Sequence, residues 1–206
     1  MIQASPLRLH ENPGTARLPG PERRPVVEAA DPAIAAMHDF RHVPAVAIPD
    51  ITPIDGALAY MSYAGTRWLF ARDAAEHLAG MVTAADIQGD KPLRHLQALQ
   101  CTFESCSRED VLVRDVMVPV AAWRTLRWED VHRATVGQIA ATFATAGREC
   151  LIVLETAAGG AENIVRGLFS LRGLEKQLGQ PIEVICPATS FAQIERVLAH
   201  GHGECH

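Results

Sequence analysis

The sequence predicts an α/β protein in which one strand–helix–strand–strand–helix unit occurs twice. An amphipathic helix in each copy ends at an Ala-Gly pair, first at Gly65 and again at Gly147. Each copy also has a Gly-apolar-x-Ser/Thr stretch before a helix, beginning at Gly80 and at Gly167. Gly147 follows Gly65 by 82 residues, whereas Gly167 follows Gly80 by 87. The extra residues fall in the turn at 157–160, where insertions are tolerated, so the spacing indicates an internal duplication.

The first copy begins near Asp39 and alternates short apolar runs with a stretch of helical periodicity. Ile54, Leu58 and Met61 recur at helical spacing after a proline, a residue that favours the start of a helix. Short apolar runs bounded by turn residues are typical of buried strands. The predicted elements are strands at 43–48, 68–71 and 78–82, a helix between Pro53 and Gly65, and a second helix from Thr83.

The second copy repeats this order. Val136, Ile139 and Phe143 lie on one face of a predicted helix that starts at Thr135. The elements expected after it are strands at 150–154 and 164–169 and a closing helix from Ser170.

The segments around the two copies have a different character. Proline recurs six times between residues 6 and 32, which removes backbone donors and predicts an extended lead-in. Near the other end, Phe191, Ile194 and Leu198 form an apolar stripe after a capping-box pattern, which predicts a last helix. The predicted organisation is an N-terminal segment at 1–38, a first motif at 39–99, a linker at 100–112, a second motif at 113–182, and a C-terminal helix and tail at 183–206.

Composition excludes several classes of protein. The net charge of −5 argues against broad nucleic-acid binding, which needs a basic face. No apolar run is long enough to span a membrane, and the first residues lack the pattern of a secretory signal. The five cysteines form no dense, even framework of disulfides. We therefore expect a cytoplasmic protein with reduced thiols.

The stretch from Gly80 to Asp86 is the most informative motif. It predicts a buried strand that runs into a helix, with the Thr83 hydroxyl at the helix start and the Asp86 carboxylate one turn later. A carboxylate in this position can accept hydrogen bonds from two neighbouring hydroxyls, such as those of a ribose. The alternative interpretation is a capping box, which occurs on many helices that bind no ligand.

The duplicated unit resembles the CBS (cystathionine-beta-synthase) motif over residues 39–180. In that family two copies pair into one pseudo-symmetric module, and adenosine compounds such as AMP, ADP, ATP or S-adenosylmethionine bind in the two clefts between them. The ribose-binding pattern of the family is Gly-apolar-x-Ser/Thr-x-x-Asp. Gly80, Thr83 and Asp86 match this pattern, and Val82 lies within it. The resemblance thus implies a nucleotide site in the first copy.

The second copy departs from the pattern at its most important position. Ser170 matches the hydroxyl residue, but Gly173 stands where the family has aspartate. Arg172 could attract an anion there, although a solvated charge on a helix is the simpler interpretation. We therefore predict one strong nucleotide site in each chain.

The resemblance also implies contacts for the rest of a nucleotide. The adenine would lie against the segment that leads into the second copy, near Pro119, Val120 and Trp123, whose ring could stack on the base. Arg67 and Arg148 precede the second strands of the two copies, where family ligands meet basic residues beside their phosphates. The alternatives are a half-buried structural tryptophan and two exposed arginines.

Two further groups of residues were weighed as sites. The C-terminal tail contains good zinc ligands, but a glycine-containing chain end does not fix their geometry; they are His200, His202, Cys205 and His206. Cys101 and Cys106 have no recognised zinc spacing, and a redox pair there is less simple than two ordinary thiols. We therefore predict no metal site and no resident cofactor.

The sequence contains no serine–histidine–acid signature, no phosphate-binding loop and no dinucleotide fingerprint. We predict a regulatory module that is not an enzyme, forms a homodimer and signals to an unidentified protein partner. Two alternatives remain at this stage. One is a CBS pair that binds no ligand and serves for dimerisation or docking, and the other is a protein that responds to metals or to thiol oxidation.

Overall fold

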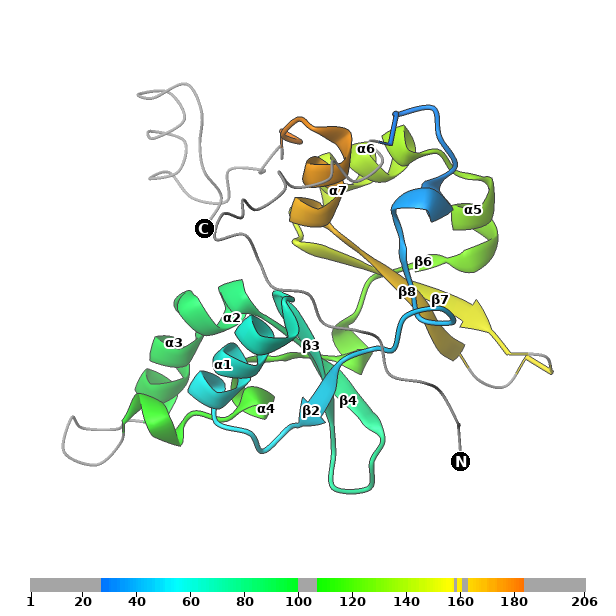
Figure 1. Cartoon of the computed structure of the whole chain (residues 1–206). Coiled ribbons are helices and arrows are strands. Elements are labelled where there is room, and N and C mark those ends of the chain that lie inside the picture. The colour runs from blue at the N-terminus through cyan, green and yellow to red at the C-terminus, as the bar shows by residue number, and fades with distance from the viewer. Residues whose placement is uncertain (1–26, 100–106, 158, 161–162, 184–206) are drawn as a thin grey trace, which may run out of the picture.

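The protein contains two four-stranded sheets, each covered by helices, in a computed structural model that describes residues 27–99, 107–157, 159–160 and 163–183 (Figure 1). The strand orders are β2-β3-β4-β5 and β1-β8-β7-β6. The first sheet consists of β2 (Ala47–Pro49), β3 (Trp68–Arg72), β4 (Leu78–Thr83) and β5 (Val118–Pro119). The second consists of β1 (His38–Asp39), β6 (Thr125–Arg127), β7 (Cys150–Thr156) and β8 (Asn163–Ser170).

The helices divide between the two sheets in chain order. The first sheet is accompanied by α1 (Ile54–Ala64), α2 (Ala84–Gln88), α3 (Lys91–Ala98), the short helix η2 (Arg108–Asp110) and α4 (Val113–Val116). The second is accompanied by η1 (Ala33–Ala36), α5 (Trp128–Arg133), α6 (Val136–Ala146) and α7 (Leu171–Leu178), and η3 (Val120–Ala122) lies between β5 and β6.

The ends of the two long helices confirm the predicted duplication. Helix α1 begins after Pro53 and ends at Gly65, whose φ of 65° lies in the left-handed region. Helix α6 ends in the same way at Gly147, with a φ of 59°. Glycine adopts this conformation without the steric cost that a side chain adds, so both helices stop where the sequence indicates.

The edge strand of each sheet comes from the segment that precedes the other copy in the chain. β5, which precedes the second copy, pairs with β4, and β1 pairs with β8. A Cβ atom on Gly80 would lie 2.6 Å from the Val118 carbonyl oxygen, and one on Gly167 would lie 2.7 Å from the His38 carbonyl oxygen. Both glycines are therefore required by the close approach of a neighbouring strand, whatever else they do.

Three apolar clusters hold the molecule together. One lies between the first sheet and its helices, and the second lies between the other sheet and its helices. A third cluster joins residues of both sheets: Trp68, Phe70, Met81, Ile152 and Leu168. Because the strands are covered on one side by helices and on the other by the opposite sheet, they are apolar almost throughout.

The N-terminal segment is more structured near its end than the prolines led us to predict. Residues 27–38 pack on the second copy, where the Val27 amide donates to the Gln177 carbonyl at 3.1 Å. Figure 1 shows this blue segment beside the helices of that copy. The reason is local: Pro32 is the one proline among these residues and precedes η1, whose Ala33 and Ala36 are small enough to enter the second core.

Other boundaries also moved. The strand predicted at 43–48 is shorter and begins later, as β2 (Ala47–Pro49), and Val43 lies outside it and is exposed. The predicted polar linker ends in a packed stretch, because Val111 is fully buried in the first core. The remaining linker residues 100–106 and the predicted C-terminal helix lie outside the described residues. Within the described part of the chain, no helix has the length and apolar character needed to cross a membrane.

Candidate functional site

Thr83 and Asp86 lie where β4 runs into α2, and their side chains form a complete capping box. The Asp86 amide donates to the Thr83 hydroxyl oxygen at 3.2 Å. In return, the Thr83 amide and hydroxyl both donate to Oδ2 of Asp86, each at 2.8 Å. The alternative interpretation of the motif is therefore realised, and Oδ2 is already occupied by the protein itself.

The other oxygen of Asp86 has a partner that the sequence did not suggest. The Lys91 ammonium lies 2.5 Å from Oδ1, and the same ammonium donates to the Val116 carbonyl at 3.1 Å. Lys91 thereby links the start of α3 to the helix that leads into the second copy. The Asp86 side chain is 14% exposed, so this carboxylate is held in a largely buried position.

The second copy approaches the same carboxylate through Cys150. Burial raises the pKa of the Cys150 thiol to about 12, and the negative charges of Glu149 and Asp86 add to the increase. Asp86 is thus one of the charges that act on the thiol of Cys150, the first residue of β7.

The residues expected near an adenine lie on and after β5. Pro119 pairs with Gly80 across the first sheet and is exposed, as is Val120. Trp123 is half-buried: its indole N–H donates to the Val118 carbonyl at 3.0 Å, and its ring centroid lies 6.0 Å from that of Phe70. Trp123 is thus the half-buried tryptophan of the alternative interpretation, and it packs against the apolar cluster that joins the two sheets.

The remaining predicted residues are more scattered. Val82 is fully buried in the first core, so its side chain faces the helices. Arg67 is exposed, and its carbonyl accepts from the amide of Ala84 at 2.8 Å, which fixes the start of α2. Arg148 is half-buried before β7. Neither arginine forms an ion pair with another described residue.

The equivalent cleft of the second copy is built from different groups. The Ser170 side chain makes no capping hydrogen bond to α7. A Cβ atom on Gly173 would lie 2.5 Å from the Ser170 hydroxyl and 3.7 Å from Nε2 of His38. The His38 ring in turn lies edge-on to Trp68, with centroids 6.2 Å apart. An imidazole, itself in contact with an indole, therefore lies near Gly173, the position that corresponds to Asp86 of the first copy.

Comparison with solved structures fits this arrangement. An uncharacterized conserved protein from Pyrococcus horikoshii matches 77% of this chain over 100% of its own length, with a TM-score of 0.50 and 14% identity. The chain has the fold of a tandem CBS pair. No protein-family model matches the sequence, and no curated protein does.

Two further matches have weaker scores. The CBS-pair protein CBSX2 from Arabidopsis thaliana has a TM-score of 0.43 and 18% identity over 70% of this chain and 92% of its own. The CBS domain of a bacterial CNNM/CorC family Mg²⁺ transporter, solved in complex with ATP, has a TM-score of 0.46 and 15% identity over 75% of this chain and 91% of its own.

A charged network in the second half of the CBS pair was missed by the sequence analysis. Arg166 is buried within β8, forms an ion pair with Asp39, and lies with Nε 3.2 Å from a Glu155 oxygen. Its guanidinium also stands 4.3 Å from the Trp128 ring centroid. Burial alone would raise the pKa of Asp39, but hydrogen bonds from Arg166 and the Arg41 amide outweigh it, and the pKa is below its usual value. The sequence signal that could have revealed this network is Arg166 itself, a charged residue within an otherwise apolar predicted strand.

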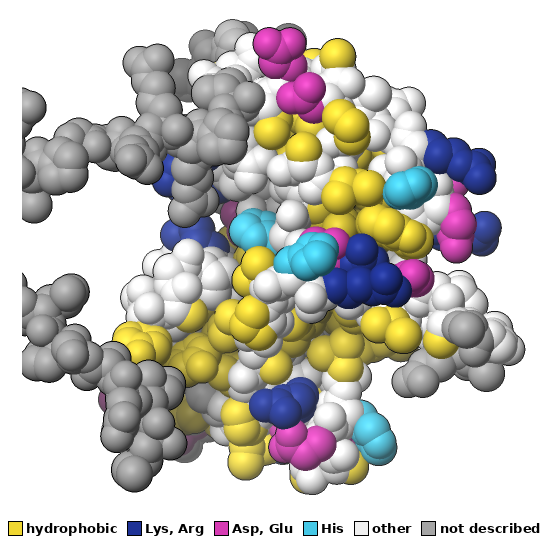
Figure 2. All heavy atoms as spheres, turned by 45° about the vertical axis from the view of Figure 1, so that its right-hand side comes forward, with side chains coloured by type: hydrophobic (Ala, Val, Ile, Leu, Met, Phe, Trp, Pro, Cys, Tyr) yellow, Lys and Arg dark blue, Asp and Glu magenta, His cyan; other side chains and the backbone are white. Residues whose placement is uncertain are grey.

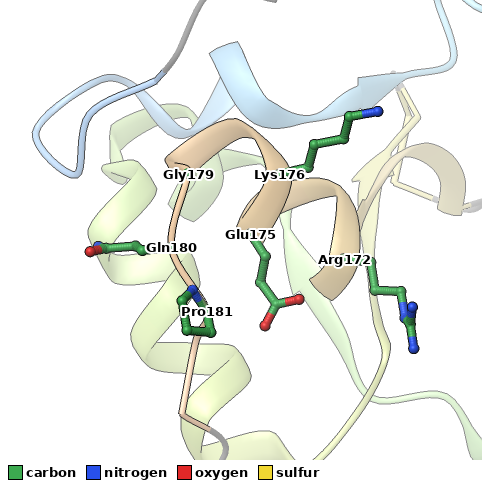
Figure 3. A pocket seen from close by; sticks show the side chains of 6 residues that line it. All are labelled: Arg172, Glu175, Lys176, Gly179, Gln180 and Pro181. Atoms are coloured by element: carbon green, nitrogen blue, oxygen red, sulfur yellow. The ribbon is translucent and has the colours of Figure 1, made fainter.

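Two surface cavities of the CBS pair lie away from the predicted site. The larger, about 450 Å³, is lined by Arg172, Glu175, Lys176, Gly179, Gln180 and Pro181 (Figure 3). Figure 3 shows Arg172 and Lys176 extending from one side of α7 and Gln180 from the opposite side, so these groups do not converge. The smaller, about 300 Å³, lies beside α5 and α6. Neither is lined by a predicted nucleotide-binding residue.

The thiol and metal alternatives gain no support from the described residues. No cluster of three or more histidine, cysteine, aspartate or glutamate side chains is found among them. Cys150 is a free thiol whose raised pKa disfavours the reactive thiolate. The other four cysteines and the histidines of the tail lie outside the described residues.

Proposed function

We propose that this CBS pair is a cytoplasmic regulatory module, without catalysis of its own, that binds one adenosine-type nucleotide per chain. The ligand is AMP, ADP, ATP or a related compound, and the site is the Thr83–Asp86 turn. The observation that carries the proposal is the Asp86 carboxylate, which is largely buried one turn after the Thr83 hydroxyl and is linked through Lys91 to the segment that leads into the second copy.

Three separate parts of the chain meet around this carboxylate. Asp86 itself follows β4, Lys91 connects it to the Val116 carbonyl before β5, and Cys150 approaches from the second copy. A ligand bound here would contact both the turn after β4 and, through Lys91, the segment that leads into the second copy. Its binding would therefore favour one relative position of the two copies, which is the differential interaction that a regulatory ligand requires.

The chemistry of the turn suits a ribose next to an apolar base. A carboxylate accepts hydrogen bonds from two adjacent hydroxyls, and each such bond to a charged group contributes about 1.5–3 kcal/mol. The exposed Pro119 pairs with Gly80 on the neighbouring strand, and Val120 follows it. These apolar groups offer a surface for adenine within the same region of the first sheet.

Calorimetry with AMP, ADP and ATP tests the proposal. We expect one site per chain, and Asp86→Ala should lower the affinity about a hundredfold, because about 3 kcal/mol of hydrogen bonding to the carboxylate is lost. Asp90→Ala is the matched control, since Asp90 is close in sequence but pairs with Arg94 on an exposed surface. Circular dichroism checks that both variants remain folded. Absence of binding by all three nucleotides, or equal affinities of wild type and Asp86→Ala, would contradict the proposal.

A ligand-free scaffold remains the second candidate, and one observation favours it. Both oxygens of Asp86 have partners within the protein, so the turn is stable without a ligand. This candidate predicts that nucleotides leave the melting temperature unchanged, whereas a ligand at 100 times its Kd adds about 2.7 kcal/mol of stability.

We also propose that the module forms a homodimer before it meets its protein partner. Large apolar side chains are exposed on the first copy, including Tyr63 at 89%, Ile51 at 60% and Leu99 at 59%. Figure 2 shows hydrophobic side chains in both the upper and the lower part of one face. Exposed apolar groups of this kind mark interaction surfaces when they form continuous patches. Light scattering that shows a monomer at micromolar concentration would contradict this proposal.

A further inference from the structure

Lys91 occupies the atom of Asp86 that a ribose would need. We propose that Lys91 is the specificity-determining residue of the nucleotide site: it closes the site to neutral nucleosides and admits nucleotides that carry phosphate. The inference rests on the proposed function, because it concerns the ligand class of the same turn. It arises from the contacts around one carboxylate and from the exposure of the two charged groups.

Both oxygens of the Asp86 carboxylate have partners within the protein. Oδ2 accepts from the amide and the hydroxyl of Thr83, and both bonds belong to the cap of α2. Oδ1 is the oxygen left for a ligand, and the Lys91 ammonium lies 2.5 Å from it. An incoming ribose must therefore displace or share an ion pair before it can hydrogen-bond to Asp86.

The two members of this ion pair differ in their freedom to move. The Asp86 side chain is 14% exposed and, apart from Lys91, is held by two donors, the amide and the hydroxyl of Thr83. The Lys91 side chain is 39% exposed and ends a flexible stem at the start of α3. Ligand entry therefore moves the lysine and leaves the aspartate in place, since an ammonium near solvent changes partners more easily than a capped carboxylate.

The charge of the ligand decides whether this movement is favourable. A neutral ribose offers Asp86 hydroxyl groups, which are weaker partners for a carboxylate than an ammonium, and it leaves Lys91 with no new anion. A phosphorylated nucleotide offers hydroxyls to Asp86 and phosphate oxygens to Lys91 together. Two neighbouring cations have acidic partners of their own, since Arg94 pairs with Asp90 and Arg108 pairs with Asp55. Arg67, at the start of α2, forms no ion pair with a described residue, but unlike Lys91 it has no contact with the Asp86 carboxylate.

The test compares adenosine with ATP on wild type and on Lys91→Met, measured by calorimetry at one fixed salt concentration. Methionine keeps the length and apolar stem of lysine but removes the ammonium. We expect Lys91→Met to bind adenosine about tenfold more tightly than wild type does, and to lose most of the preference for ATP over adenosine. Lys91→Arg should retain the wild-type preference, because it keeps the positive charge.

Arg94→Met is the matched control, because it removes one positive charge from the same helix without touching Asp86. It should leave the ratio of the two affinities unchanged. If wild type binds ATP and Lys91→Met keeps the same ratio of ATP to adenosine affinity, the inference is wrong while the proposed function stands. If only Lys91→Met binds the two ligands, Lys91 blocks the site to ATP as well as to adenosine, and both the inference and the proposed function are wrong. If neither protein binds, both ideas fail.

Discussion

The two strand-to-helix turns of this CBS-like fold, at Thr83 and at Ser170, have equivalent places in the two sheets but different side chains. The first residue of β3 is Trp68 and that of β7 is Cys150, and each pairs with the hydroxyl residue that precedes a helix. The Thr83 turn continues to Asp86, which is held by Lys91, whereas the Ser170 turn continues to Gly173, which lies near Nε2 of His38. The first turn has a carboxylate, and the second has glycine at the same position with an imidazole nearby. Duplication preserved the framework and changed the groups that a ligand would meet.

The edges of the two sheets differ in the same way. On the first sheet, β5 ends in Pro119, which is exposed and carries no charge. On the second sheet, β1 ends in Asp39, which is buried against Arg166. The second half is therefore held at this edge by a buried ion pair that the first half lacks, and the three predictions below test how far the two halves have diverged.

The largest effect is expected from Asp39→Asn, which removes one partner of the buried pair. The change should lower the free energy of unfolding by about 2–3 kcal/mol, less than the 3–5 kcal/mol typical of such losses, because Glu155 remains near Arg166. Because the folded-state pKa of Asp39 is lowered, its contribution is present at neutral pH and is lost as the pH falls through that pKa.

Urea denaturation from pH 7 to pH 3 measures this dependence. Asp55→Asn is the control, because it breaks an exposed pair with Arg108 in the first half and should cost less than about 1 kcal/mol. Equal losses in the two variants would show that the buried pair gives the second half no special stability.

Smaller effects, equal in the two halves, are expected from Gly80→Ala and Gly167→Ala. Each new methyl group meets a backbone carbonyl oxygen of the borrowed edge strand, so each variant should lose about 1–3 kcal/mol of stability. Gly56→Ala is the control, because its methyl group would meet only Thr52 at 3.6 Å, and alanine favours a helix. A clear loss at one glycine and none at the other would show that the two crossings are not equivalent.

The smallest effect is expected from Gly173→Asp, which restores the aspartate of the motif in the second copy. The new side chain would crowd the Ser170 hydroxyl and lie near Nε2 of His38, so its carboxylate should pair with the imidazole. Calorimetry should still give one nucleotide per chain. A second site of similar affinity would mean that His38 and Trp68 leave room for a ligand.

The local part of this fold was predictable from sequence, and the long-range part was not. Gly65 and Gly147 end helices because of their own backbone freedom, so short stretches of sequence reveal them. The pairing of β1 with β8 depends on contacts between residues far apart in the chain, and a strand of two residues leaves no periodic pattern.

The candidate site shows the same division. The hydroxyl and carboxylate of Thr83 and Asp86 were identified from their spacing, and the turn that joins them has the predicted geometry. Lys91 was not identified, because its contact with Asp86 depends on how α3 turns back after α2. Trp123 was assigned to a ligand because an aromatic ring suits a base, but burial against Phe70 suits it equally well.

The exchanged edge strands set the order in which this protein can assemble during synthesis. The first sheet is complete once β5 has been made, at residue 119. The second sheet needs both its earliest strand, β1, and its last, β8, so the first part of the chain must wait for residue 168. During that interval β1 has no partner strand, and the ribosome must add about 130 residues between the two. The N-terminal segment is thus the first part of the described chain to emerge and one of the last to find its place.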